Sequence, residues 1–418
     1  MGWTSIDDFV AETTANGKYC RTDWQKLYAQ AAATAGRWYD LSLGQGNPSN
    51  FSYYAGLTPY VGGYGEMLRN GGFQGGANYW TLSDAGWVWA SNTMTKVNAG
   101  AAGALISTGM QKTPVAGRTY RITWTMSACA GGNIVARIGN TAGAARAAAG
   151  TYTETLIAAN GDALRFTPSA IGTTATITYI SVIEPLQSFT MDDSLQGSMY
   201  HGGDVAPDSK HLINAGCVTP SATTAPTTLT LVDMLMCYPG IALNSAAVQT
   251  FLNANVLPRY ADGVGVRSYL VTNVLAGAAT PSLYMRYENT AALSDRTLPN
   301  VPVLVTGTPS QHIPHTGVAA GNFGPFLPWQ AGDLGMVNAQ SLQISSTMTT
   351  GEACLMLCKP LAALPVTTQY VMAERDYFNQ LPSLPRIYDG ACLGLIACAG
   401  AAIPATGSFQ GYCDFAWG

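Results

Sequence analysis

The stretch that organises this sequence is Leu384-Pro385-Arg386-Ile387-Tyr388-Asp389-Gly390. Its framework, Leu-Pro-Arg-x-x-Asp-Gly, also occurs as Leu257-Pro258-Arg259-Tyr260-Ala261-Asp262-Gly263, 127 residues upstream (384 − 257). Asp-Gly is a turn dipeptide, and proline lacks the N–H that an internal strand must donate. Each copy therefore predicts an edge segment, a turn and a following strand.

Other segments recur around both copies in the same order. An apolar segment with a Cys-x-Pro end precedes each copy, and a Gly-Ala segment followed by an aromatic-bearing strand comes after it. The three pairs are 235–239 and 356–360, 275–279 and 398–402, and 283–287 and 409–413. Matched landmarks in one order predict a duplicated unit.

These patterns predict a mainly β chain with duplicated β-sandwich modules. We place the first module at 187–305 and the second at 306–418. Helical propensity rises near 371–378 and more weakly near 246–252, so one short helix is expected in each module. Nothing in either module has the pattern of an active site.

Composition indicates a protein that works inside an assembly. Only 11% of the 418 residues are charged, against about 25% in ordinary soluble domains, and 47% are hydrophobic. Such a chain stays in solution most readily when its apolar surface is buried between subunits, and closed rings are the usual outcome. We expect a homo-oligomer, namely a trimer whose two modules per chain form a pseudo-sixfold ring.

The formal net charge of −4 conceals a distinct middle segment. Residues 67–186 hold eight Lys/Arg and four Asp/Glu, a net +4, whereas the rest of the chain holds twelve and twenty, a net −8. Neither part has the dense basic stripe of a nucleic-acid-binding protein, so no direct nucleic-acid partner is expected. The reversal of charge predicts a self-contained domain at 67–186.

Cysteine usage and hydropathy indicate where the chain is made. The nine cysteines lie mostly in apolar strands, which is typical of proteins in a reducing compartment. The start, Met1-Gly2-Trp3, has no basic segment before an apolar one, so we expect no signal peptide. The longest apolar run, 391–404, has 14 residues, short of the ~20 of a membrane span. We expect a soluble chain made in a cytoplasm, with no membrane partner.

Residues 1–66 predict a short helix followed by an arm. Ser5 can cap a helix in which Ile6, Phe9 and Val10 form one apolar stripe, and Asn16-Gly17 would end it. The segment that follows is rich in aromatic residues and glycine and has little periodicity. We expect it to pack on the C-terminal half as an extended arm or short strands.

Residues 67–186 have the pattern of short strands separated by turns. The clearest strand is 119–126, where Tyr120, Ile122, Trp124 and Met126 alternate with polar residues. The spacing of the apolar segments predicts a sandwich of roughly eight short antiparallel strands. The further strands are expected at 133–138, 152–157, 162–166 and 175–183.

This middle domain resembles the jelly-roll carbohydrate-binding modules, in versions found in tailed-phage structural proteins. The similarity rests on Asn70-Gly71-Gly72-Phe73, the strands of Trp80 and Trp87, residues 116–124, and residues 150–154 leading to 164–166. It implies a jelly-roll domain inserted into the rest of the chain. An exposed aromatic face can stack on a pyranose ring, and the candidates for such a sugar platform are Tyr79, Trp87 and Trp89, with Arg137. Core packing is the alternative for each of them.

The sequence contains no familiar catalytic frame. Gly-x-Ser-x-Gly, the Walker loop and the dinucleotide fingerprint are all missing. His312 and His315 stand too close together for a helical zinc pair, and Asp192-Asp193, Asp204 and Asp208 lack the dense Asp/Asn/Gly loop of a calcium site. We expect no catalytic residue, no metal site and no cofactor, and the histidines are expected to be structural.

Residues 1–65 and 187–418 resemble uncharacterised virion proteins of tailed phages. The similarity implies a structural protein of the particle, made in the host cytoplasm and located in the virion. The residues that carry it are 5–8 through 17–18, 36–40, 202–205 with 210–212, 324–328, and 385–386 through 415–418.

We therefore expect a non-enzymatic phage virion protein that decorates or cements the capsid exterior, with the jelly roll facing outward. Its partners would be further copies of itself, the major capsid protein or other virion proteins, and host surface glycans. One alternative is a tail or fibre component that binds host carbohydrate through the jelly roll. Another is a polysaccharide-degrading tailspike, because the paired carboxylates of a glycosidase are distant in sequence.

Overall fold

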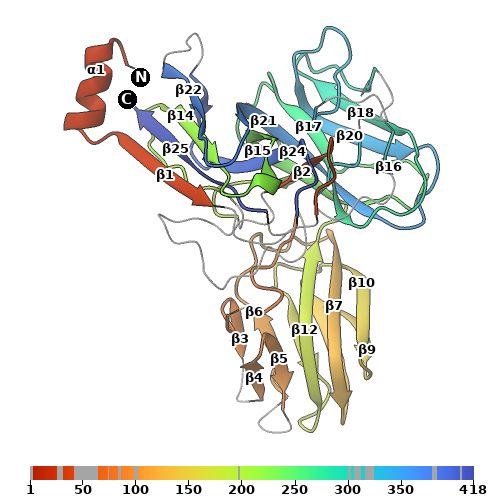
Figure 1. The fold of residues 1–418 in the computed structure, drawn as a ribbon. Coiled ribbons are helices and arrows are strands. Elements are labelled where there is room, and N and C mark those ends of the chain that lie inside the picture. Colours follow the sequence, from red (N-terminus) through yellow and green to blue (C-terminus); the bar gives the residue numbers. More distant parts are fainter. Residues whose placement is uncertain are drawn as a thin grey trace. The chain divides into compact units, whose positions relative to one another are not determined.

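The regular secondary structure of the computed structural model is almost entirely β-strand, which confirms the expected mainly β class (Figure 1). The chain forms two compact units, one of residues 1–55 with 186–418 and one of residues 56–185. None of the described helices is long and apolar enough to cross a membrane. The structure describes residues 3–25, 32–41, 65–73, 75–82, 86–97, 102–195, 198–299, 303–305, 312–315, 324–378, 384–404 and 407–418.

Within its described residues, the larger unit contains three antiparallel sheets. The first outer sheet has the strand order β1-β25-β14-β22, with β23 also paired to β14, and the second outer sheet has the order β16-β20-β18-β19. The central sheet has the order β17-β21-β15-β24-β2, with β13 paired to β15. The strand bounds are β1 Tyr19–Gln25, β2 Trp38–Asp40, β13 Phe189–Thr190, β14 Lys210–Val218, β15 Thr227–Ala242, β16 Gln249–Thr250, β17 Arg267–Val274, β18 Leu283–Asn289, β19 Arg296–Thr297, β20 Met336–Ile344, β21 Glu352–Val366, β22 Ala373–Asp376, β23 Arg386–Ile387, β24 Cys392–Ala399 and β25 Gln410–Trp417.

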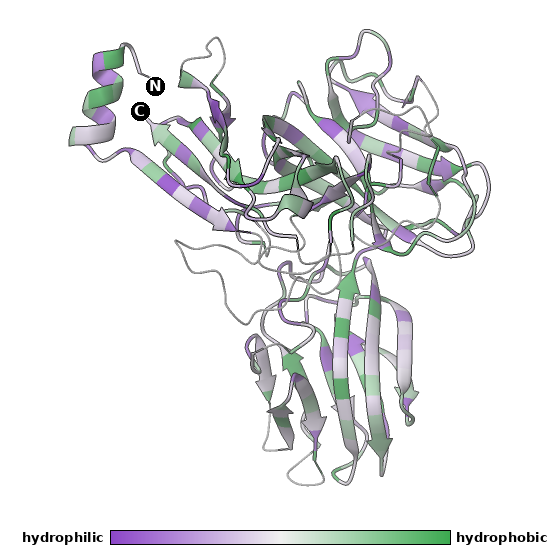
Figure 2. Cartoon of the chain, in the orientation of Figure 1, coloured by the Kyte–Doolittle hydropathy of each residue, from purple (hydrophilic) through white to green (hydrophobic). Residues whose placement is uncertain are grey.

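Two long strands of the central sheet supply both hydrophobic cores of this unit. Strand β15 contributes Leu229 and Leu231 to the core that it shares with the first outer sheet. Further along, it contributes Leu235 and Tyr238 to the core shared with the second outer sheet. Strand β15 is buried almost without a break over its 16 residues. A strand buried in this way must have other elements packed on both of its faces along its whole length. Figure 2 shows the hydrophobic residues gathered in these central strands.

The larger unit is internally duplicated, and the strand order makes this visible. In chain order the first repeat supplies β14, β15, β16, β17 and β18, and the second supplies β20, β21, β22, β24 and β25. Each Leu-Pro-Arg copy precedes the matching central strand, β17 or β24. The two outer sheets then have equivalent orders, β25-β14-β22 and β18-β20-β16. The sequence repeat is therefore a repeat of structure.

The division at residues 305 and 306 is corrected by the pairing of the strands. Strand β14 of the first repeat pairs with β22 and β25 of the second, and β15 pairs with β21 and β24. Each sandwich is thus built from both repeats. The two repeats exchange strands, so a cut between them in sequence does not separate two bodies.

The two short helices expected within the repeats are edge strands instead. Residues 373–376 form β22, which pairs with β14, and residues 249–250 form β16, which pairs with β20. The two segments are equivalent, as the sequence indicated, but their type was predicted wrongly. An unpaired sheet edge offered backbone partners that outweigh a modest helical propensity.

The N-terminal segment packs on the larger unit. Helix α1 (Ile6–Val10) begins as predicted at Ser5, whose side chain accepts a hydrogen bond from the Asp8 N–H at 3.1 Å. A π-helical turn (Ala11–Ala15) follows it, and Gly17 has φ +66°. Strand β1 then pairs along β25, and β2 pairs with β24. Most of the rest of the predicted arm lies outside the described residues.

The smaller unit is a sandwich of two five-stranded antiparallel sheets, with the orders β10-β7-β12-β5-β4 and β3-β6-β11-β8-β9. The predicted alternation in β7 is confirmed, because Tyr120, Ile122, Trp124 and Met126 are buried while their neighbours are more exposed. The strand bounds are β3 Trp80–Leu82, β4 Trp87–Ala90, β5 Thr93–Lys96, β6 Leu105–Ser107, β7 Thr119–Ala130, β8 Ile134–Ile138, β9 Thr141–Arg146, β10 Gly150–Ile157, β11 Arg165–Pro168 and β12 Thr174–Ile183.

A buried carboxylate ties together the two ends of the smaller unit. Glu66 accepts hydrogen bonds from the Val182 N–H at 2.8 Å, the Leu68 N–H at 3.0 Å and the Ser181 hydroxyl at 2.5 Å. The Met67 N–H also donates to the carbonyl of Val182 at 2.8 Å. The change in charge predicted that the unit starts at residue 67. The structure places the start earlier, because Glu66 belongs to the core of the unit.

Candidate functional site

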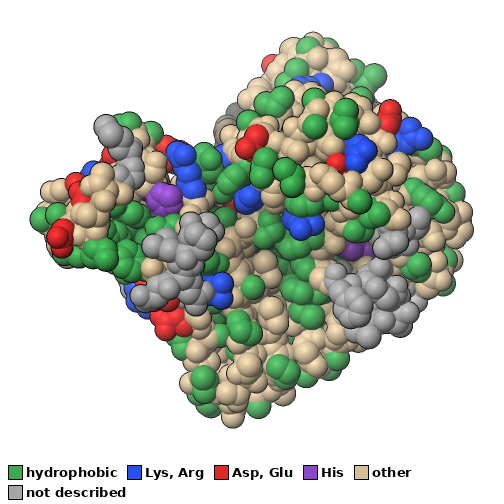
Figure 3. Space-filling view, turned by 90° about the horizontal axis from the view of Figure 1, so that it is seen from above, with side chains coloured by type: hydrophobic (Ala, Val, Ile, Leu, Met, Phe, Trp, Pro, Cys, Tyr) green, Lys and Arg blue, Asp and Glu red, His purple; other side chains and the backbone are tan. Residues whose placement is uncertain are grey.

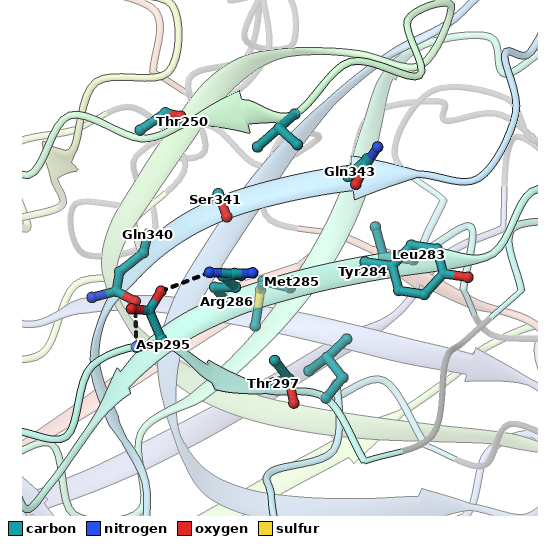
Figure 4. Close-up of a pocket in the computed structure, with 12 residues that line it drawn as sticks. Thr250, Leu283, Tyr284, Met285, Arg286, Asp295, Thr297, Gln340, Ser341 and Gln343 are labelled. Carbon is teal, nitrogen blue, oxygen red and sulfur yellow. Dashed lines mark hydrogen bonds and ion pairs between the residues drawn. The ribbon is translucent and has the colours of Figure 1, made fainter.

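An open groove on the second outer sheet is a candidate binding surface formed by described residues. Its volume is about 600 Å³, within the usual range for small-ligand sites. The twelve residues that line it come from β16, β18, β19, β20 and the segments beside them (Figure 4). They are Val248, Thr250, Leu283, Tyr284, Met285, Arg286, Asp295, Thr297, Leu298, Gln340, Ser341 and Gln343.

Strand alternation decides which side chains face this groove. In β18, Leu283, Met285 and Tyr287 are buried in the sandwich core, so Tyr284 and Arg286 point to the opposite, exposed face. In β20, Leu342 is buried, and Ser341 and Gln343 flank it on the groove side. The polar face of the sheet is thus a direct result of the two-residue period in the sequence.

Charged and amide groups at one end of the groove hold one another in place. Arg286 Nη1 donates to Asp295 Oδ1 at 3.1 Å, and the Asp295 N–H donates to Gln340 Oε1 at 2.8 Å (Figure 4). Tyr284, 47% exposed, lies further along the same strand. An exposed ring beside hydroxyl, amide and guanidinium groups suits the apolar face and the hydroxyls of a sugar.

The described residues of the groove offer groups for binding a ligand and a single carboxylate. Among the described lining residues Asp295 is the only carboxylate. Glycosidases of the usual kind place two carboxyl groups across the scissile bond. The described groups of the groove can therefore contact a glycan through one exposed ring and several hydrogen-bonding side chains.

The sugar platform predicted in the smaller unit is not assembled. Trp87 is 1% exposed, and its indole donates to the carbonyl of Gly103 at 2.9 Å, so it is a core residue. Tyr79 and Trp89 are exposed at 45% and 38%. Arg137 lies on β8, and two strands, β6 and β11, separate β8 from β3, which follows Tyr79. The four residues therefore do not share one surface.

A second cluster lies where residues 192–210 meet the second Leu-Pro-Arg turn. Ligand-type atoms of Asp193, His201 and Asp204 all lie within 4.8 Å of one another. The carboxylate Oδ1 of Asp204 accepts a hydrogen bond from the Gly390 N–H at 2.8 Å. Asp389 in turn accepts from the N–H groups of Val205 and Ala206, at 2.9 and 3.2 Å. Hydrogen bonds in both directions thus join the loop that contains Asp204 to the second Leu-Pro-Arg turn.

The His201 ring at the centre of this cluster is completely buried. Its Nδ1 lies 3.1 Å from the Nζ of buried Lys210, which also donates to the carbonyls of His201 and Gly203. Desolvation lowers the pKa of His201 to about 4, and the positive charge of Lys210 adds to this shift. The imidazole is therefore neutral at physiological pH.

Sequence analysis considered Asp193 and Asp204 only as ligands of a calcium loop and did not join His201 to them, so it missed this cluster of three. The signal that points to it is His201-Gly202-Gly203-Asp204, in which both glycines have positive φ, +88° and +76°. These two residues turn the chain so that Asp204 comes back beside His201. Asp208, which was considered together with Asp204, instead pairs with Lys18 at 2.9 Å.

His312 and His315 pack among residues of the larger unit. The His315 Nε2 accepts from the Leu270 N–H at 3.1 Å, and burial lowers the pKa of this ring to about 3. His312 stacks against Tyr39 with 5.9 Å between the ring centroids.

No protein-family model matches the chain, and a search of curated proteins finds no match either.

Proposed function

We propose that this chain is a non-enzymatic structural protein of a tailed-phage virion, and that it decorates or cements the outside of the capsid. The observation that carries the proposal is the strand-exchanged duplication of the larger unit. Two sandwiches that share two continuous central strands make one rigid building block with two equivalent outer sheets. Such a block can make similar contacts twice, which suits a lattice with near-equivalent positions.

Exposed apolar side chains occur at equivalent places in the two repeats and support association. Beside β16, Val248 and Leu252 are exposed, and beside β22, Tyr370 and Val371 are exposed. Both strands end their sheets in the strand order. A sheet edge with apolar neighbours is a template for pairing with another chain. We propose that these two edge patches, Val248/Leu252 and Tyr370/Val371, join neighbouring subunits of a trimer.

The distribution of charge is consistent with protein partners. On the face seen in Figure 3, Lys, Arg, Asp and Glu side chains are few and scattered among hydrophobic and uncharged polar ones. A surface of this kind lacks the basic stripe that tracks a nucleic-acid backbone. Other subunits and the major capsid protein are the partners that we propose.

Antibody labelling of purified particles tests the proposal. Gold-labelled antibodies against the chain should decorate the head in negative-stain images, at regular positions and in many copies. Particles that remain unlabelled while the chain is found free in the lysate would refute a structural role. Label confined to the tail would refute capsid decoration and favour the second candidate.

That second candidate is a tail or fibre component that binds host surface carbohydrate. The groove of the second outer sheet favours it, because Tyr284, Arg286 and Gln343 offer stacking and hydrogen bonding on one open face. This differs from the earlier expectation, which placed sugar binding on the inserted domain. Saturation-transfer NMR with host polysaccharide should show contact that Tyr284→Ala abolishes and Tyr370→Ala, at an exposed tyrosine outside the groove, leaves intact.

A further inference from the structure

We propose that Asp193, His201 and Asp204 bind a divalent transition-metal ion through two carboxylates and the Nε2 atom of the imidazole. The three ligand-type atoms lie within 4.8 Å of one another. A common ion about 2.0–2.2 Å from each atom requires separations of at most about 4.4 Å, so the three groups need to close by no more than a few tenths of an ångström. The proposal concerns a site that is separate from the groove and independent of the virion role.

The buried histidine provides the observation that points to a ligand. The His201 side chain is 0% exposed, and among the described residues its Nε2 has no hydrogen-bond partner. The nearest carboxylate oxygen to Nε2 is Asp193 Oδ2 at 3.5 Å, too long for a good hydrogen bond. A buried polar nitrogen without a partner is costly. A metal ion between Nε2 and the carboxylates removes that cost.

The surroundings of the ring already hold it in the orientation of a metal ligand. Metal-binding imidazoles use one nitrogen for the ion, and a second group fixes the other nitrogen. Here Lys210 Nζ lies 3.1 Å from Nδ1, and Nε2 faces Asp193, 3.5 Å from its Oδ2. With an ion on Nε2 the ring proton sits on Nδ1 and is donated to Lys210 as a neutral amine, so binding of the ion releases one proton to solvent. The ion and the amine would then lie on opposite sides of the imidazole.

The carboxylates are positioned by separate segments of the chain. The Gly390 N–H of the second Leu-Pro-Arg turn holds Asp204. Asp193 follows Asp192, whose Oδ1 accepts from the Ser194 N–H at 3.1 Å and from its hydroxyl. Asp193 is partly exposed and Asp204 is exposed, which gives an ion access from solvent. A bound ion would tie the 192–204 loop to this turn.

The donor set selects the class of ion. One imidazole nitrogen and two carboxylate oxygens suit Zn²⁺ or Mn²⁺, with water in the remaining positions. Ca²⁺ takes six to eight oxygen ligands in most of its sites, and Mg²⁺ retains several waters and takes oxygen ligands. We therefore expect Zn²⁺ or Mn²⁺ to bind and Ca²⁺ and Mg²⁺ to bind at least tenfold more weakly.

Isothermal titration of the chelator-treated full chain with Zn²⁺, Mn²⁺, Ca²⁺ and Mg²⁺ tests the site. The expected result is one Zn²⁺ or Mn²⁺ per chain, with affinity reduced at least tenfold in Asp193→Asn and in Asp204→Asn. Asp262→Asn is the matched control, since Asp262 caps the equivalent first turn by accepting from the Val264 N–H at 3.1 Å and lies outside the cluster. Its affinity should equal that of the wild type.

A spectroscopic readout keeps the test independent of folding. The chain has four histidines, so imidazole ¹⁵N signals can be assigned by substitution, and Zn²⁺ should shift the Nε2 signal of His201 alone. No binding by the folded wild-type chain would overturn the proposal. Binding that Asp193→Asn and Asp204→Asn leave unchanged, or a shift at another histidine, would show an adventitious ion and overturn it as well.

Discussion

The two arginines of the repeated motif occupy the same sequence position and have different surroundings. Arg259 is buried and donates to Asp233 from Nε at 2.9 Å and from Nη2 at 2.7 Å. Arg386 is exposed and stacks on Tyr388, 4.4 Å from the ring centroid. Asp233 stands four residues before Cys237, whereas Cys354 stands four residues before Cys358. The second repeat therefore lacks the acidic partner.

This difference gives a matched pair of substitutions. Arg259→Ala should lower the free energy of unfolding by about 3–5 kcal/mol, because it leaves a buried carboxylate without its cation. Arg386→Ala should cost less than about 1 kcal/mol, as is usual for exposed side chains. Urea titration of the whole chain, followed by circular dichroism, measures both. Equal losses would contradict the structural difference between the two copies.

Glu66 should make the stability of the smaller unit depend on pH. Burial raises the pKa of this carboxyl from 4.5 to about 7, although the hydrogen bonds from Ser181, Val182 and Leu68 oppose the shift. The unfolded carboxyl loses its proton near its ordinary pKa, while the folded one keeps its proton up to about pH 7. Stability is therefore greatest below the ordinary pKa and is lost as pH rises through this interval, by up to about 3 kcal/mol.

Urea titrations followed by tryptophan fluorescence between pH 4.5 and 8 measure this effect. Glu66→Gln should be less dependent on pH over the interval, since the amide does not titrate. At low pH its stability should stay close to that of the wild type, because the amide keeps one acceptor oxygen and its N–H₂ takes the place of the carboxyl O–H. A wild-type chain whose smaller unit becomes more stable as pH rises through the interval would contradict the assignment.

Sequence alone could identify the residue types at the sites but not their depth. Trp87 and Trp89 are two positions apart on one strand, so they point to the same side. Trp87 lies inside the sandwich and Trp89 lies where that cover ends. The sequence pattern gives the side of a strand and does not give its distance from the edge of the core. For the same reason, the sequence could not show that His201 is buried.

Among the elements, the duplicated turns were the most predictable part of the fold. Both Asp-Gly dipeptides form turns, with φ +69° at Gly263 and +66° at Gly390. Their surroundings differ, because a Cβ at Gly263 would lie 2.7 Å from the Met336 carbonyl oxygen, whereas nothing lies within 4 Å of one at Gly390. The same backbone conformation therefore has different steric requirements in the two repeats.

This contrast predicts unequal costs for the same substitution. Gly390→Ala should cost about 1–2 kcal/mol, the penalty of positive φ for a residue with a side chain. Gly263→Ala should cost more by at least about 1 kcal/mol, since the methyl group also meets a backbone oxygen that cannot rotate away. The urea midpoints of the two variants measure the difference. A larger loss for Gly390→Ala would contradict the register of the first turn against β20.

The exchange of strands between the repeats could not be read from the sequence. Repeat landmarks fix which elements are equivalent, but they do not state whether β14 pairs within its own repeat or with the other one. The pairing follows from β15 of the first repeat and β21 of the second, which lie side by side. Each of these strands contributes residues to both sandwiches. For the same reason β16 and β22 are strands, because neighbours distant in sequence determine their conformation.

For the whole molecule, the insertion of the smaller unit has a direct consequence. A fragment of residues 56–185 should fold alone and unfold cooperatively, because the unit has its own core. A fragment of 67–186, the boundary indicated by charge, should be less stable because it lacks Glu66 and leaves its three donors without that acceptor. Proteolysis and thermal melts of both fragments measure the difference. Equal stability would show that Glu66 does not anchor the unit.

The mass of the purified chain in solution tests the proposed assembly most directly. One subunit has a mass of 43.8 kDa, so the proposed closed trimer, joined through the two edge patches of each subunit, has a mass of about 131 kDa (3 × 43.8). Mass photometry, supported by sedimentation at micromolar concentration, should show that species, and Val371→Asp should dissociate it. A stable monomer of the unmodified chain at micromolar concentration would contradict both the trimer and the capsid-decoration role that depends on it.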